Sequence, residues 1–117
     1  MNLDNAVQTH ALWKTKLRAA ISKHEQLDLT TLSRDDCCEL GQWLHGEGKS
    51  GYGKLASHGD CVQKHVMFHS EVTKVAKAVN AKQFDVAEGM LSAGTSYAEA
   101  SSALSVSFLQ LRKQAGI

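Results

Sequence analysis

Apolar side chains recur at steps of three and four residues along most of the chain, which is the period of one face of an α-helix. This pattern predicts three long amphipathic helices, over about residues 3–25, 57–79 and 84–114. A shorter helix is predicted over residues 34–45, and the chain contains no proline that would interrupt any of these segments. We therefore expect an all-α fold, an antiparallel, four-helix-bundle-like arrangement of three long helices and one short, cysteine-bearing helix.

The segments between the predicted helices are rich in polar residues or glycine. Residues 26–33 lose the apolar period and are predicted to be a connection. The stretch GEGKSGYGK, residues 46–54, contains four glycines and is predicted to be a flexible loop. It is not expected to bind phosphate, because no strand precedes it. Ser33 and Ser57 are each followed by an aspartate three residues later, which predicts capping boxes at the start of two helices.

Length and composition narrow the class of protein. The 117 residues are expected to form a single domain, residues 1–117. Thirteen basic and twelve acidic residues give a net charge of +1 with no basic cluster, so we expect no nucleic-acid partner. The lack of a membrane-spanning apolar run and of a secretory signal predicts a cytoplasmic protein without membrane insertion. Three cysteines, an odd number, favour reduced thiols or thiolate ligands over a disulfide framework.

Histidines interrupt the apolar faces of two predicted helices. His65 and His69 lie one turn apart in a stripe with Cys61 and Phe68, and His10 lies about one turn before Trp13. A buried imidazole costs free energy unless its nitrogens find partners, and a metal ion supplies one partner for each ring. Two alternatives remain open from the residues alone. His65 and His69 could lie at the edge of the stripe, and His10 could donate to a backbone carbonyl at the edge of the core.

Three imidazoles and one thiolate form a set of nitrogen and sulfur ligands that suits tetrahedral Zn²⁺. The thiolate would come from Cys37 or Cys38 on the short helix. Neighbouring residues on a helix point about 100° apart, so only one of the two can face the core. The helical period does not decide between them. A zinc ion held from three separate segments would also stabilise their packing.

The chain resembles the chemoreceptor zinc-binding domain family over most of its length. The resemblance consists of HALWK at residues 10–14, CELGQWL at residues 38–44 and HVMFH at residues 65–69, and the Cys-x-Leu-Gly-x-Trp block is its most specific part. It implies that the zinc ligands are His10, Cys38, His65 and His69, and so selects Cys38 over Cys37. It also implies a homodimeric cytoplasmic module of chemotaxis receptors or diguanylate cyclases that responds to zinc and to oxidants such as hypochlorous acid.

A zinc ion with four protein ligands has no open position for substrate, so we do not expect an enzyme. The predicted function is a zinc-binding sensory domain in bacterial signalling. The thiolate is the one oxidisable ligand, and its oxidation, or a change in zinc occupancy, would alter the packing of the bundle. The altered bundle would control a chemoreceptor or cyclase output domain in the same chain, or a partner in trans.

The sequence also predicts where the remaining cysteines and histidines lie and which aspartates contact the imidazoles. Cys61 stands where the family usually has an aliphatic residue and is expected to be a small buried hydrophobe, and Cys37 to be a thiol on the flank of the short helix. Asp36 and Asp60 are expected to orient the imidazoles. His24, His45 and His58 are expected at the surface, with His58 the most plausible substitute ligand.

Three other functions are alternatives to the predicted zinc-binding domain. A metal-free interaction or dimerisation module would leave the histidines incidental. A line of small residues on the last helix permits close approach within the bundle or across a dimer, at Ala87, Gly94, Ala98 and Ser101. A di-iron bundle requires Glu-x-x-His spacing, which does not occur in the chain. A thiol oxidoreductase would require Cys-x-x-Cys beside a βαβ unit, whereas Cys37 and Cys38 are adjacent in a helical chain.

Overall fold

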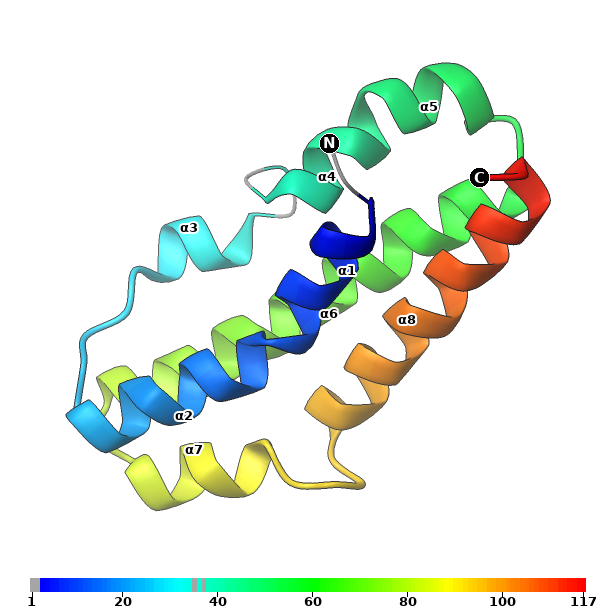
Figure 1. Ribbon diagram of the computed structural model, residues 1–117. Helices are drawn as coiled ribbons and strands as arrows, with labels where there is room; N and C mark the ends of the chain where they lie inside the picture. Colours follow the sequence, from blue (N-terminus) through cyan, green and yellow to red (C-terminus); the bar gives the residue numbers. More distant parts are fainter. Residues whose placement is uncertain (1–2, 35, 37) are drawn as a thin grey trace.

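The computed structural model describes residues 3–34, 36 and 38–117, and every regular element in this part of the chain is a helix. The helices are α1 (Leu3–Ala11), α2 (Trp13–Lys23), α3 (Leu29–Ser33), α4 (Glu39–His45), α5 (Glu47–Tyr52), α6 (Ala56–Asn80), α7 (Phe84–Met90) and α8 (Ser96–Ala115), arranged as in Figure 1. The predicted all-α bundle is confirmed. Within the described residues, no helix is both long and apolar enough to cross a membrane.

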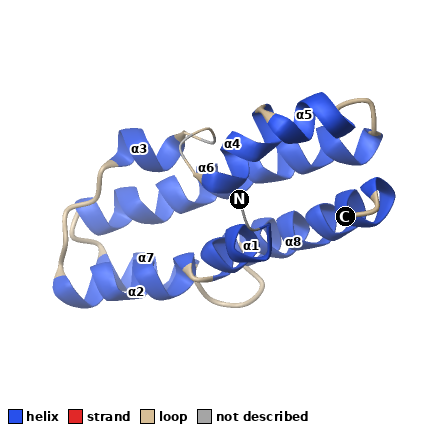
Figure 2. Cartoon of the chain, turned by 45° about the horizontal axis from the view of Figure 1, so that its top comes forward, coloured by secondary structure: helices blue, strands red, loops and turns tan. Residues whose placement is uncertain are grey.

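The helices form four rods, three of which are made of consecutive shorter helices. α1 and α2 form one rod, α3 to α5 the second, α6 the third, and α7 with α8 the fourth (Figures 1 and 2). α6 is 25 residues long and packs most extensively against α8. Phe68 and Val72 of α6 and Phe108 and Leu111 of α8 are at most 1% exposed. Burying a side chain of this size contributes about 1.5–3 kcal/mol, so the contact between α6 and α8 is the main apolar support of the fold.

Two of the long predicted helices are divided. The first is interrupted only at Leu12, and the backbone hydrogen bonds from Leu12 to Gln8 and from Lys16 to Leu12 keep α1 and α2 nearly continuous. The prediction of one helix over residues 84–114 was wrong. α7 ends at Met90, and Gly94 in the connection that follows has a φ of +81°, which a helix interior does not adopt. The Thr95 hydroxyl then accepts the Ala98 N–H and starts α8.

The predicted connection and the predicted loop both contain helices. In residues 26–33, the Asp28 carboxylate accepts the N–H groups of Thr30 and Thr31 and so caps α3. The glycine-rich stretch forms α5 instead of a flexible loop. A Cβ atom on Gly48 would lie 2.8 Å from the ring of Trp43 and 2.8 Å from its carbonyl oxygen. The glycine therefore allows α5 to pack closely on α4.

Neither predicted capping box is formed. Ser33 is the last residue of α3, and the residue that caps α4 is Cys38, whose sulfur accepts the Gly41 N–H. α6 begins after Leu55, with no side-chain cap. The line of small residues predicted on one helix is divided between α7 and α8, and its first member, Ala87, is fully buried in the bundle.

The packing of α5 on α4 predicts opposite effects for two glycine substitutions in the same helix. Gly48→Ala should lower the free energy of unfolding by about 1–3 kcal/mol, because its methyl group overlaps Trp43. Gly51→Ala should raise it by up to about 1 kcal/mol, because the new methyl group meets nothing within 4 Å and alanine favours the helix. Urea unfolding followed by circular dichroism measures both. Equal effects of the two substitutions would show that α5 does not pack on Trp43.

Candidate metal centre

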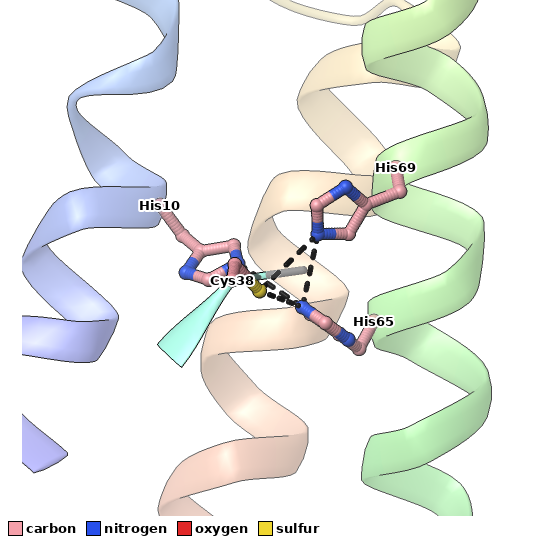
Figure 3. A group of neighbouring side chains, drawn as sticks. All are labelled: His10, Cys38, His65 and His69. Carbon is pink, nitrogen blue, oxygen red and sulfur yellow. Dashed lines mark hydrogen bonds between the residues drawn. The ribbon is translucent and has the colours of Figure 1, made fainter. Parts of the chain in front are cut away.

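Four polar side chains from three parts of the chain converge inside the bundle. Figure 3 shows His10 of α1, Cys38 at the start of α4, and His65 and His69 of α6 pointing toward one another. One ligand atom of each lies within 4.8 Å of the ligand atoms of the other three. The structure therefore brings together the four residues singled out in the sequence, and their role as zinc ligands stays a prediction.

The distances between these atoms suit a tetrahedral ion. The Nε2 atom of His65 lies 3.1 Å from Nε2 of His10 and 3.0 Å from Nε2 of His69. The Cys38 sulfur lies 3.2 Å from Nε2 of His65 and 3.6 Å from Nε2 of each of the other two. Zinc bonds of about 2.0–2.1 Å to nitrogen and about 2.3 Å to sulfur place tetrahedral ligand atoms about 3.4 Å apart for two nitrogens and about 3.6 Å for sulfur and nitrogen.

Hydrogen bonds within the cluster can pair the four atoms only two at a time, whereas a tetrahedral cation contacts all four together. A neutral imidazole carries one N–H, and a thiol is a weak donor. The His69 ring uses its Nδ1–H to donate to the Leu32 carbonyl at 3.0 Å, which leaves the lone pair of its Nε2 facing the other rings. A cation placed among these lone pairs would satisfy them together. The cluster is thus able to hold a metal ion.

The local sequence explains how each side chain reaches the cluster. His65 and His69 are 0% and 3% exposed because they share the apolar face of α6 with Phe68. The centroid of the Phe68 ring lies 5.5 Å from that of His10, so an apolar wall adjoins the site. Cys38 is half-buried and has an extended backbone, and its sulfur accepts the Gly41 N–H at 3.3 Å. The positive end of a helix favours a thiolate at this position.

Burial decides the charge of the central imidazole. Burial, together with repulsion from His69, His10 and His45, lowers the pKa of His65 to about 3. The ring is therefore neutral at physiological pH, which is the form that binds a metal ion. Its Nδ1 is buried and has no hydrogen-bond partner among the described residues.

The carboxylates expected to orient the imidazoles have other partners. Asp36 pairs with Arg34 at 3.0 Å, and Asp60 accepts the hydroxyl of Ser107 at 2.8 Å. The group that orients His69 is instead the carbonyl of Leu32 on α3. A backbone carbonyl has no residue type, so the sequence contains no signal that would have identified it.

The remaining cysteines and histidines lie outside the cluster or outside the described residues. Cys61 is 0% exposed, which confirms the predicted small buried hydrophobe, whereas the prediction for Cys37 falls on a residue that is not described. His24 and His45 are exposed, as expected. The prediction for His58 was wrong. It is 7% exposed, and its Nε2–H donates to the Leu44 carbonyl at 2.8 Å.

A family model described as chemoreceptor zinc-binding domain matches residues 10–76 of the chain. The matched span begins at His10 and includes Cys38, His65 and His69. No curated protein sequence and no solved structure matches the chain.

The two described cysteines should differ in reactivity. Burial raises the pKa of the Cys61 thiol to about 11, so at pH 8 only about one thiol in a thousand is ionised. In metal-free folded protein with Cys37→Ser, iodoacetamide should alkylate the half-buried Cys38 and leave Cys61 unmodified. Peptide mass spectrometry distinguishes the two sites, and the same reaction in urea should modify both. Rapid alkylation of Cys61 in the folded protein would contradict its burial.

Proposed function

The chain belongs to the chemoreceptor zinc-binding domain family, and we propose that it is a sensory domain whose zinc ion is held by His10, Cys38, His65 and His69. The observation that carries the proposal is the convergence of three imidazole nitrogens and one sulfur at distances that suit tetrahedral zinc. Four protein ligands fill the coordination of the ion, and this supports a regulatory role instead of catalysis.

Zinc binding would join three rods of the bundle. Among the described side chains of α1, which are those of residues 5 and 8–11, only His10 is buried. Cys38 stands at the start of α4, which is seven residues long, and His65 and His69 belong to the long α6. Bound zinc supplies a positive charge that keeps the sulfur a thiolate and ties α1 and α4 to α6.

Oxidation of Cys38 would remove one of these ties. The thiolate attacks the chlorine of hypochlorous acid and releases hydroxide, and water then replaces chloride on the sulfur, with loss of a proton. The net change converts thiolate and hypochlorous acid into sulfenic acid and chloride, with two electrons moving from sulfur to chlorine. A sulfenic acid is a poor zinc donor. Cys38 is half-buried, so we expect so small an oxidant to reach its sulfur.

The three histidines would retain zinc weakly while α4 is released, so the bundle would change its packing at one corner. We propose that this change controls a chemotaxis receptor or diguanylate cyclase output domain, in the same chain or in a cytoplasmic partner. Val106 and Leu109 on the outer side of α8 are 57% and 62% exposed. Their exposure supports a homodimer in which a change in one bundle is passed to the assembly.

Removal of the metal should lower stability. Protein purified without a histidine tag should contain about one zinc ion per chain, and chelation should lower the midpoint of thermal unfolding. Free zinc at about 100 times its dissociation constant stabilises a folded state by about 2.7 kcal/mol, so added zinc should restore the midpoint. Metal analysis and calorimetry measure the two effects. A chain that neither contains nor binds zinc would be a metal-free interaction module.

Loss of the thiolate should weaken zinc binding and abolish the oxidant response. Cys38→Ala should lower zinc affinity by more than the roughly 10–100-fold that loss of an outer hydrogen bond costs, because it removes a ligand. Hypochlorous acid should then cause no further change in zinc affinity or circular dichroism. Cys61→Ala removes a thiol that lies outside the cluster and serves as the matched control. Unchanged metal content in Cys38→Ala would remove Cys38 from the site.

A further inference from the structure

The buried contact of His58 lies outside the metal cluster and has no part in the function proposed above. His58 is in the first turn of α6, and its Nε2–H donates to the carbonyl of Leu44, near the end of α4. We propose that His58 is a positioning residue for the zinc thiolate, which holds one end of α4 so that Cys38 at the other end reaches the cluster. The inference rests on the proposed zinc site and adds to it a residue that does not touch the ion.

The two attachments of α4 have matching spans. Cys38 meets His65 at one end of α4, and Leu44 meets His58 at the other, so α4 runs antiparallel to this part of α6. The six residue steps from Cys38 to Leu44 cover about 9 Å of helix, and the seven steps from His58 to His65 cover about 10.5 Å. The short helix therefore fits between two histidines of one α6 face without a change in length.

α4 needs such an anchor because it is only seven residues long. A helix of this length is unstable alone and leaves its last carbonyl groups without helical partners. The N–H of Gly46 bonds to the carbonyls of Gln42 and Trp43, and His58 takes the carbonyl of Leu44. Leu44 is 0% exposed, so water cannot easily replace the imidazole as the donor. Loss of the donor would leave a buried carbonyl unpaired and loosen this end of the helix.

The position of α4 sets the position of the sulfur. Cys38 precedes the first residue of α4 and caps it through the Gly41 N–H, so the thiol moves with the helix. A loosened α4 would hold the sulfur near the three imidazoles for a smaller fraction of the time. Zinc affinity would fall in proportion to that fraction, although all four ligands remain.

Two substitutions of similar length test this role. His58→Gln places an amide N–H near the position of Nε2 and can still donate to Leu44, whereas His58→Met fills similar space and cannot donate. His58→Met should lower zinc affinity by about fivefold to tenfold, the usual effect of losing one hydrogen bond. His58→Gln should stay within about twofold of the parent. Competition with a chromophoric zinc chelator measures both affinities.

Amide hydrogen exchange of the metal-free chain provides a second readout. Residues of α4 should exchange faster in His58→Met than in the parent and His58→Gln, while protection of α8 stays unchanged. Parental zinc affinity in His58→Met, or equal losses in both variants, would overturn the proposal, since the second result indicates packing without a specific hydrogen bond. If the parent bound no zinc, the function proposed above would fail, and the exchange of α4 would still test the anchor itself.

Discussion

Three imidazole nitrogens and one sulfur face one another within the bundle, and this cluster constrains how the rods around it can pack. Buried polar atoms must be paired, and hydrogen bonds pair these four only two at a time. A cation bound among them would contact all four together and would be the strongest polar link between the rods. The contact between α6 and α8 is different, because it consists of buried apolar side chains. The bundle thus has an apolar frame and a polar cluster through which a bound ion would join three of the rods.

The rod formed by α3, α4 and α5 is the one most dependent on polar contacts. No residue of α3 is buried, whereas α4 buries Leu40 and Leu44, and a series of polar contacts joins this part of the chain to α6. The contacts follow opposite chain directions, pairing Leu27 with Asn80, Leu32 with His69, Cys38 with His65, and Leu44 with His58. A hydrogen bond of this kind contributes about 0.5–1.5 kcal/mol, so a metal ion held by Cys38 and His65 would dominate the series. A change at the sulfur would then act on the attachment of α4.

The helical period was enough to predict the all-α class and the inward direction of His65 and His69, because it is encoded by residues close in sequence. The period could not choose between Cys37 and Cys38, and the family motif made that choice.

The roles of Gly48 and His58 depend on a ring and a carbonyl contributed by other helices. Such partners are set by the packing of one element on another, so a pattern within a single segment does not contain them. The break at Gly94 was missed because glycine also occurs inside helices.

The place of Cys38 at the start of α4 couples the chemistry of the sulfur to the helix. The same atom faces the three imidazoles and accepts the Gly41 N–H, so it caps the helix and would also bind the metal ion. A thiolate is favoured there by the positive end of the helix. Oxidation to a neutral sulfenic acid would weaken both contacts at once, since the charge that attracts the ion is also the charge that stabilises the first turn. A cysteine inside the helix would lose only the metal bond, because its backbone would already be satisfied by helical hydrogen bonds. The capping position thus makes the structure of α4 itself sensitive to the state of the sulfur.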